Sequence, residues 1–451
     1  MFTNDNTECS TKISIISQIK FDKWLLKQSS FIKNWSLSNN FKAESGKILK
    51  VPYEDGRLKE VLIGEGVDQN LEGVSSFSSL NNGNYYIFAK FAKSKESEIH
   101  KAWAWGNYNF QSKPKKNLLY IKDQKELEFL TFYTQCINFS RDLINSPANK
   151  LNPLSYYTKI KSNQMFKKFN FVEHSEKDIG TQFPLTYAVG KSSSVKPKVI
   201  EITNKKILQK DKPLVIIGKG VTFDTGGVNI KPGNSMRNMK KDMGGSAIAI
   251  SLFLLANYLL KKTKIVLIAP LAENSVSSKS MRPGDVYKSA SGKSVEIAHT
   301  DAEGRLLLAD AIEKAMSYNP SMIIDFATLT GAARVALGED LPAYFCNNEL
   351  IAKKIDNLNK EKLRCWRLPL YQPYLKKIKS QVAELSNASL DGMAGSITAA
   401  LFLKEFLNTS DTPWLHFDTY AWSQGSILGS NGAALQGLEI MCEFLRKNFN
   451  E

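Results

Sequence analysis

Apolar runs and longer segments with helical spacing alternate along the last two thirds of the chain. Short, continuous apolar runs predict buried strands at residues 213–217, 265–269, 322–327 and 414–417. Longer apolar patterns predict helices at residues 244–260, 304–318, 394–407 and 435–449. Such alternation favours an α/β domain in which helices cover a mixed, mostly parallel sheet and functional loops lie at the ends of the strands.

The first part of the chain has a different pattern. Residues 1–123 contain short apolar runs, such as residues 85–91, between polar loops, which predicts a small N-terminal α/β domain of unassigned role. A connecting helix is expected at residues 124–147 and a larger domain at residues 148–451. The helix is expected because its segment ends at a proline and because five apolar side chains have helical spacing: Leu127, Leu130, Phe132, Ile137 and Leu143. A chain of 451 residues exceeds the usual size of one hydrophobic core, which agrees with two domains.

One segment of the larger domain carries paired carboxylates. Residues 299–311 read HTDAEGRLLLADA, in which Asp301 and Glu303 stand two positions apart and Gly304 opens a helical pattern. In an extended segment both carboxylates would leave the same face, an arrangement suited to a hard divalent cation. The alternative for an isolated pair of this kind is a solvated surface position, because charged residues mostly lie on the surface.

A second segment supports the metal interpretation. The predicted strand at residues 213–217 leads into glycine-rich loops that carry four charged residues: Lys219, Asp224, Lys231 and Asp242. With the pair described above, the two aspartates bring four negative charges, which two divalent cations would neutralise. Lys219 would be a further ligand if its amine is deprotonated, because only a neutral amine has a lone pair to offer. In the alternative, both lysines are ordinary surface charges.

Both segments resemble the leucyl (cytosol) aminopeptidase family. The family's GKG-x-TFD-[ST]-GG, LKP-G, MK-x-DM-GGA and NTDAEGRL-x-L-x-DA patterns recur in the same order, together with AEN, RPGDV and TLTGA. The resemblance extends from about residue 137 to the C-terminus. It implies a metal-dependent enzyme that releases N-terminal amino acids from peptides, with a preference of the leucine type.

The resemblance also implies a site with two metal ions. One ion would be held by Asp224, Asp301 and Glu303. The second ion would be held by Lys219, Asp224, Asp242 and Glu303. The carboxylate-rich ligand set suits Zn²⁺ or Mn²⁺, and the sequence does not choose between them.

Two further residues take catalytic roles by the same resemblance. Lys231 would polarise the scissile carbonyl, and Arg305 would hold a bicarbonate that serves as general base. The attacking group would be a hydroxide that bridges the two ions, because paired metal ions can lower the pKa of a shared water. The chain has four histidines, and among them only His299 lies in a motif, where the family usually has Asn. This scarcity argues against a Ser-His-Asp or Cys-His enzyme.

The resemblance also predicts where the first side chain of the substrate binds, and the pocket residues would be Met239, Thr328, Leu329, Gly331 and Tyr420. Met239 would supply an adaptable apolar wall, and Leu329 and Gly331 would offer backbone groups. Tyr420 falls where a small residue usually lines the pocket, so its ring would reduce the space for large side chains. In the alternative, Tyr420 is an aromatic strand residue that fills the core.

Composition adds expectations about location and partners. We expect a cytoplasmic protein that acts on peptides, because the N-terminus lacks a basic segment followed by an apolar run and the cysteines form no CxxC. The longest apolar stretch, at about residues 247–260, is too short to span a bilayer, so no membrane association is expected. The family resemblance implies a homo-hexamer.

The formal net charge of +16 raises an alternative, a nucleic-acid-binding or scaffold protein that uses a peptidase fold. Basic stretches at residues 113–116 and 376–379 could contact phosphates. Lysine is spread through the whole chain without a recognised binding module, which favours a general compositional bias. A two-metal phosphoesterase is a weaker third alternative, because a lysine ligand and the TFDTGG and TDAEGR contexts do not suit phosphate chemistry.

Overall fold

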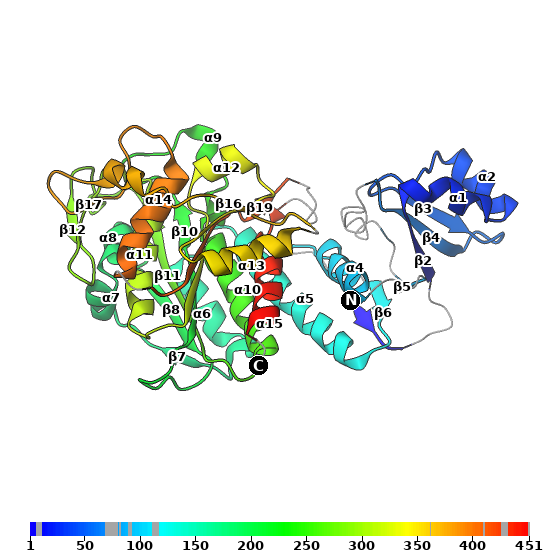
Figure 1. Cartoon of the computed structure of the whole chain (residues 1–451), viewed down its shortest axis with the longest axis horizontal. Coiled ribbons are helices and arrows are strands. Elements are labelled where there is room, and N and C mark those ends of the chain that lie inside the picture. The colour runs from blue at the N-terminus through cyan, green and yellow to red at the C-terminus, as the bar shows by residue number, and fades with distance from the viewer. Residues whose placement is uncertain are drawn as a thin grey trace. The chain divides into compact units, whose positions relative to one another are not determined.

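The computed structural model describes residues 1–5, 11–67, 80, 83–88, 93–110, 117–360, 362–408, 411–424 and 432–449. The chain divides into two compact units, each of which is described by itself (Figure 1). The smaller unit comprises Met1–Asn138 and Ser423–Gly432, and the larger unit comprises Phe139–Trp422 and Ala433–Glu451. Helix α5 (Gln124–Asn145) lies where a helix was predicted at residues 124–147, and the division falls within it. The exact domain bounds stay a prediction.

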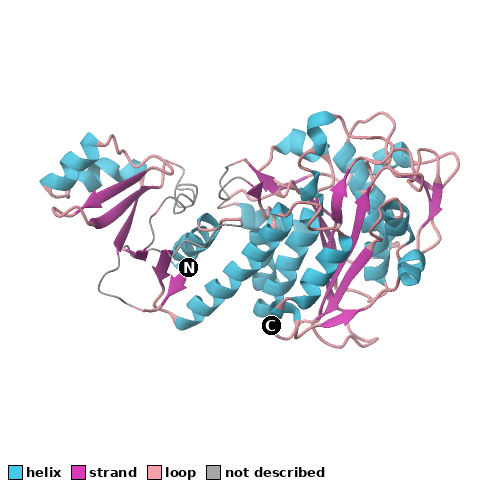
Figure 2. Cartoon of the chain, turned by 180° about the vertical axis from the view of Figure 1, so that it is seen from behind, coloured by secondary structure: helices cyan, strands magenta, loops and turns pink. Residues whose placement is uncertain are grey.

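A nine-stranded mixed sheet forms the centre of the larger unit (Figure 2). Its order is β16-β15-β18-β14-β9-β11-β8-β7, and β10 pairs with β11. The five pairs β15–β16, β18–β14, β14–β9, β9–β11 and β10–β11 are parallel, whereas β8–β11, β7–β8 and β15–β18 are antiparallel. The sheet is therefore mixed and mostly parallel, as predicted. Its strands are β7 (Asn170–Val172), β8 (Lys198–Thr203), β9 (Leu214–Gly218), β10 (Gly220–Asp224), β11 (Ile265–Asn274), β14 (Met322–Ala327), β15 (Ala343–Cys346), β16 (Trp366–Arg367) and β18 (Trp414–Asp418).

The four predicted strands are all present, as β9, β11, β14 and β18. Every residue of β9, β14 and β18 is buried, which explains why these segments read as continuous apolar runs. Strand β11 continues past the predicted end at residue 269 to Asn274, because its second half pairs with β10. The predicted run at residues 85–91 forms strand β5 in its first part, and residues 89–91 lie outside the described residues.

Helices cover both faces of this sheet (Figures 1 and 2). Helix α10 (Gly244–Leu259) packs on β9 and β14, with α15 (Leu438–Asn448) beside it. On the opposite face, α11 (Gly304–Met316) packs on β9 and β11, next to α8 (Pro184–Gly190) and α14 (Gly395–Lys404). Helices were predicted for α10, α11, α14 and α15, and the structure confirms all four. The remaining helices of this unit are α6 (Pro153–Ser162), η3 (Gln164–Phe166), α7 (Glu176–Gln182), α9 (Gly233–Met236), η4 (Met239–Met243), α12 (Gly331–Leu337), α13 (Glu349–Asn359), η5 (Gln372–Ile378) and η6 (Glu405–Leu407).

The short strands β12 (Val286–Lys288), β13 (Ser294–Glu296) and β17 (Leu385–Ser386) form a three-stranded sheet within the larger unit. The strands β19 (Trp422–Ser423) and β20 (Gly432–Ala433) form a two-stranded sheet. The basic stretch at residues 376–379 begins in the last turn of η5, and the stretch at residues 113–116 lies outside the described residues.

The smaller unit contains a six-stranded mixed sheet, which confirms an N-terminal α/β domain. Its order is β1-β6-β5-β2-β4-β3, and only the β3–β4 pair among these is antiparallel. Val61, Ile63, Tyr85 and Trp103 are buried together in its core. The elements are β1 (Phe2–Thr3), β2 (Thr11–Ile16), η1 (Gln18–Lys20), α1 (Phe21–Leu26), α2 (Ser30–Ser38), β3 (Ile48–Pro52), β4 (Leu58–Gly64), β5 (Gly83–Ile87), α4 (Lys93–Gly106) and β6 (Asn117–Tyr120).

Helix α10 is the most apolar helix of the core. The stretch Gly233–Leu259, which ends with α10, has the length and composition of a membrane span, but 83% of its most apolar window is buried inside the protein. Its apolarity is thus accounted for by the sheet and the helices that surround it. Glycines permit this close packing: a Cβ on Gly245 would lie 2.2 Å from the carbonyl oxygen of Phe326 in β14.

The Gly245→Ala substitution tests how tightly α10 packs on the sheet. The added methyl group meets backbone that cannot yield as a side chain can, so we expect a loss of about 1–3 kcal/mol or more in the free energy of unfolding. Thermal unfolding followed by circular dichroism measures the change. Gly180→Ala in α7 is the matched control, because nothing lies within 4 Å of its Cβ. Equal melting temperatures for the two variants would contradict the packing described.

Candidate metal centre

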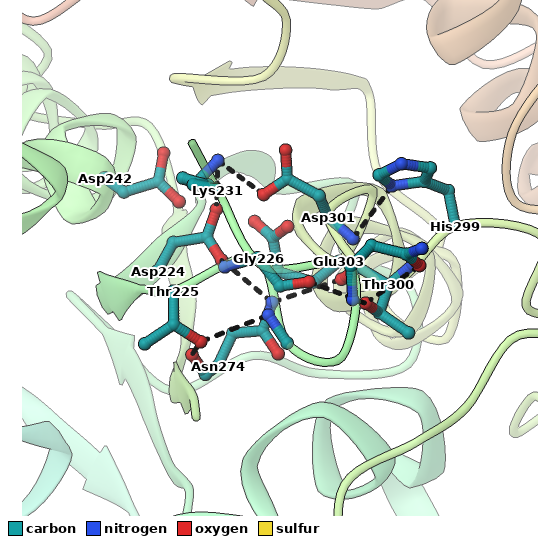
Figure 3. Close-up of polar contacts among 12 residues, drawn as sticks. Asp224, Thr225, Gly226, Lys231, Asp242, Asn274, His299, Thr300, Asp301 and Glu303 are labelled. Atoms are coloured by element: carbon teal, nitrogen blue, oxygen red, sulfur yellow. Dashed lines mark hydrogen bonds and ion pairs between the residues drawn. The ribbon is translucent and has the colours of Figure 1, made fainter. Parts of the chain in front are cut away.

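The predicted metal ligands gather where β9 and β10 end and where α11 begins. Lys219 lies between β9 and β10, Asp224 is the last residue of β10, and Asp242 lies in η4. Asp301 and Glu303 come from the turn before α11. Figure 3 shows the carboxylates of Asp224, Asp242, Asp301 and Glu303 around one central space. The structure therefore brings together residues that are up to 84 positions apart, from 219 to 303.

Lys219 is buried and surrounded by oxygen atoms. Its Nζ donates to Asp242 Oδ1 at 2.9 Å and to the carbonyl oxygen of Thr328 at 2.9 Å, and it lies 3.0 Å from Glu303 Oε1. A Cβ on Gly304 would lie 2.4 Å from Cε of this lysine, so glycine at that position leaves room for the lysine stem. Packing against Lys219 thus explains why the DAEGR motif has a glycine at position 304.

Lys231 contacts the other side of the cluster (Figure 3). Its Nζ lies 2.8 Å from Asp224 Oδ2 and 2.5 Å from Asp301 Oδ1. The side chain of Lys231 is more accessible than that of Lys219, at 13% against 3% exposed. The two lysines therefore differ in position: one is enclosed by the carboxylates, and the other reaches them from the accessible side.

The expectation of an extended segment at Asp301 and Glu303 is wrong. Asp301 lies in a turn, and Glu303 has φ −74° and ψ −35°, a helical conformation at the N-cap of α11. Their carboxylates reach one space because the chain turns between them, not because they share the face of a strand. Glu303 is 1% exposed and Asp301 is half-buried.

Uncharged residues hold the carboxylates in place, and among them only Thr328 was predicted at the site, as a pocket residue. Asn274 Nδ2 donates to Asp224 Oδ1 at 2.8 Å, and the amide of Gly226 donates to the same oxygen at 2.8 Å. Thr328 Oγ1 donates to Asp242 Oδ1 at 2.8 Å, and Thr300 Oγ1 donates to the carbonyl oxygen of Gly226 at 2.6 Å. Asn274 ends the AEN motif, so the sequence carried a signal for that residue.

Burial and mutual repulsion shift the pKa values of the cluster. Burial, with Asp224 adding to it, raises the pKa of Asp301 to about 6 against the opposing effect of Lys231. The same two causes raise the pKa of Glu303 well above its usual range. Burial alone would lower the pKa of Lys219, but the nearby carboxylates, led by Asp242, raise it instead. Anions crowded in this way are stabilised by additional positive charge.

The donor set fits a divalent cation. Ligand oxygens of Asp224, Asp242 and Glu303 all lie within 4.8 Å of one another. Oε2 of Glu303 is buried and lacks a hydrogen-bond partner among the described residues. Buried carboxylate oxygens without donors are costly, and a bound cation offsets that cost.

Arg305 is buried beside the cluster with unused hydrogen-bond capacity. It is 7% exposed, and its Nε and Nη1 have no hydrogen-bond partner among the described residues. Burial lowers the pKa of Arg305 to about 10, while Glu303 and Asp418 oppose that shift. A buried guanidinium with unsatisfied donors favours an anionic ligand.

Among the predicted pocket residues, the structure places Thr328 in contact with the cluster. Thr328 is buried against Asp242, whereas Met239 and Leu329 are half-buried and Gly331 is exposed. The amide of Leu329 donates to Asp418 Oδ1 at 3.2 Å, so that amide already has a partner. Tyr420 is half-exposed, and its ring contacts Lys241, which directly precedes Asp242.

His299 lies at the rim and shows no contact with the cluster carboxylates within the described residues. The exposed imidazole accepts a hydrogen bond at Nδ1 from the amide of Asp301, at 3.2 Å. Burial of its inner edge, together with Lys231 and Arg305, lowers the pKa of His299. Its amide and carbonyl are held by the side chain of Asn387.

Buried carboxylates and lysines at the strand ends of an α/β sheet, with a donor set suited to divalent cations, define a metal-dependent hydrolase. The model of the cytosol aminopeptidase family catalytic domain matches residues 138–441, and the model of the M17 aminopeptidase N-terminal domain matches residues 11–122. The chain belongs to the cytosol aminopeptidase family. It is a metallo-exopeptidase, and the second match extends the likeness to the N-terminal residues in which no motif was recognised.

Individual relatives agree with the family models. The chain is 40% identical over 288 residues to the probable cytosol aminopeptidase of Chlamydia caviae, which covers 62% of this chain and 57% of that protein. It is 35% identical over 399 residues to the cytosol aminopeptidase of Buchnera aphidicola, which covers 84% of this chain and 78% of that protein. The crystal structure of cytosol aminopeptidase from Coxiella burnetii has a TM-score of 0.91 at 34% identity, over 100% of this chain and 99% of that chain.

The raised pKa values predict that metal binding depends on pH. Without metal, the pKa values of Asp301, Glu303 and Lys219 are raised, so these groups keep their protons to a higher pH than ordinary carboxyl and amino groups do. A cation that binds them must displace those protons. The affinity for Mn²⁺ should therefore rise with pH. We expect a Kd at pH 8 about tenfold or more below that at pH 6, with net proton release. Isothermal titration calorimetry in buffers of different ionisation enthalpy measures both, and a Kd independent of pH would contradict this assignment.

Proposed function

We propose that this aminopeptidase holds two divalent ions in the cluster described above. Asp224, Asp301 and Glu303 would hold one ion. Lys219, Asp224, Asp242 and Glu303 would hold the other. The observation that carries the proposal is the burial of Asp224, Asp242 and Glu303 with ligand oxygens within 4.8 Å of one another. Two such ions balance the four carboxylates, and Lys219 then binds as a neutral amine.

The chain's own residues would complete the chemistry around the ions. When bound, the ions lower the pKa of a water molecule and polarise the scissile carbonyl. Lys231 stays charged, because it lies on the accessible side of the cluster, and its ammonium stabilises the negative charge that develops on the carbonyl oxygen. Its contacts with Asp224 and Asp301 fix the orientation of that ammonium.

Arg305 would hold the general base. Its two unpartnered N–H groups suit a small planar anion, and bicarbonate offers oxygen atoms that pair with a guanidinium. This anion would accept a proton from the attacking water and pass it to the leaving amine. The carboxylates of the cluster would not serve as this base, because all four would be occupied as metal ligands.

The first side chain of the substrate would lie against Met239, Thr328, Leu329, Gly331 and Tyr420. Thr328 supports this position, because it contacts Asp242 directly and thus borders the reacting centre. The resemblance implies a leucine-type preference, and the ring of Tyr420 would reduce the space for large side chains. Exposure of Tyr420 argues for the pocket role over the core role.

The other proposals concern composition and assembly. We propose Zn²⁺ or Mn²⁺ as the native ion, a homo-hexamer as the assembly, peptides as the substrates and the cytoplasm as the location. Family membership and the cytosol aminopeptidase names of the relatives support these. Taken alone, the net charge of +16 would favour nucleic-acid binding. The buried acidic cluster gives that alternative no support.

Substitution of the two lysines separates their proposed roles. Lys231→Ala should leave the metal content near normal while kcat falls about 10²-fold or more, as expected for loss of a group that stabilises the transition state. Lys219→Ala should weaken binding of one ion, because it removes a ligand. Metal analysis by mass spectrometry, together with kcat on aminoacyl arylamides, measures both effects.

Two results would overturn these roles. Near-full kcat in Lys231→Ala would remove that residue from the chemistry. Equal loss of metal in both variants would show that the two lysines do not differ in the way proposed. Lys354→Ala is the matched control for a lysine outside the site, because Lys354 is an exposed residue of α13.

A further inference from the structure

Two cations flank the ring of Tyr420 at the edge of the site. Lys241 Nζ lies 4.3 Å from the ring centroid, and the guanidinium carbon of Arg334 lies 4.8 Å from it. Both distances fall within the range of cation–π contacts. Lys241 of η4, Arg334 of α12 and Tyr420 of the loop after β18 therefore form one cluster, which we call the basic group.

Neither cation has a carboxylate partner within 4.0 Å among the residues that the structure describes. Lys241 is 4% exposed, so its ammonium is largely removed from water. Lys219 and Lys231, by comparison, each contact two carboxylates. Burial of an unpaired ammonium is costly, and a carboxylate from a bound molecule would offset that cost.

The nearby carboxylates do not neutralise the group. Asp242 is held by Lys219 and Thr328. Asp418 accepts from the amides of Leu329 and Thr330. It also accepts from Thr330 Oγ1 and Ser396 Oγ. Glu339 is half-buried in the same small hollow as Tyr420 and Arg334, and it is a single anion against two cations.

The basic group lies where the proposed pocket lies. Lys241 directly precedes Asp242, and Arg334 lies in α12, three residues after Gly331, where that helix begins. One guanidinium nitrogen of Arg334 lies 4.0 Å from the position of a Cβ on Gly331. A side chain that contacts Gly331 and Tyr420 is thus within reach of Arg334.

We infer that this pocket selects substrates whose N-terminal residue is acidic, glutamate or aspartate, with Lys241 and Arg334 as the specificity-determining residues. The inference rests on the proposed position of the substrate side chain. A carboxylate there pairs with both cations, whereas leucine leaves Lys241 buried and unpaired. The ring of Tyr420 then holds the two cations in place and does not simply fill space.

Glutamyl and glutaminyl arylamides give the sharpest test, because the two side chains have the same size and differ in charge. We expect kcat/KM of the wild-type holoenzyme to be about tenfold or more higher for the glutamyl substrate. A leucyl arylamide serves as the apolar reference. A ratio of glutamyl to glutaminyl kcat/KM near one in the active wild-type enzyme would overturn the inference.

Charge-removing variants identify the residues responsible. Arg334→Met and Lys241→Met keep the approximate length of each side chain and remove the cation. Each should lower the glutamyl to glutaminyl ratio several-fold, and the double variant should bring it to about one. Arg334 is exposed, so its variant keeps the test valid even if Lys241→Met fails to fold. Lys353→Met on exposed α13 is the control, and it should leave the ratio unchanged.

The outcomes separate this inference from the proposed function. If no arylamide is hydrolysed by the metal-loaded wild-type enzyme, the proposed function fails. If all three are hydrolysed without preference for the acidic one, the proposed function stands and the inference fails. A preference that persists in Arg334→Met and in Lys241→Met would show that other residues select the acid.

Discussion

The larger unit is organised around a burial of charge that protein groups alone do not balance. Four carboxylates converge on one space, and two lysines supply half of the opposing charge. Much of the local structure exists to hold that arrangement: strands β9 and β10 end beside it, α11 begins at Glu303, and Gly304 leaves room for the stem of Lys219. A bound divalent metal would resolve the imbalance.

The sequence predicted the centre of the fold well because that part is strongly patterned. Strands β9, β14 and β18 are buried on both faces and therefore appear as unbroken apolar runs, and α10 and α11 carry long apolar patterns. The antiparallel pairs formed by β7, β8 and β15 near the two ends of the sheet were not predicted. The direction of a strand depends on how the loops return to the sheet, and it leaves no local pattern in the sequence.

The sequence singled out the charged residues that the structure brings together, and among the uncharged residues that hold them in place it singled out only Thr328. Spacing and glycine context singled out the candidate metal ligands, but they gave the wrong backbone at Asp301 and Glu303, because a turn and a helix N-cap also bring carboxylates together. Thr328 was predicted as a pocket residue from the family resemblance, but the hydrogen bonds of Thr300 and Thr328 were not predicted, because they join segments that meet only in the folded chain. Lys241 and Arg334 were not singled out, because basic residues are common along this chain. Their inferred role in substrate selection depends on a shared contact with Tyr420, which the sequence does not reveal.

The proposed roles of Lys219, Lys231 and Arg305 all depend on the two-ion centre, and metal titration tests that centre. Metal-free protein should be titrated with Mn²⁺, and separately with Zn²⁺, while hydrolysis of an aminoacyl arylamide is followed. We expect no hydrolysis without metal and a plateau of activity at two equivalents of ion per chain. Full activity in the presence of a strong chelator, or a plateau at one equivalent, would contradict it.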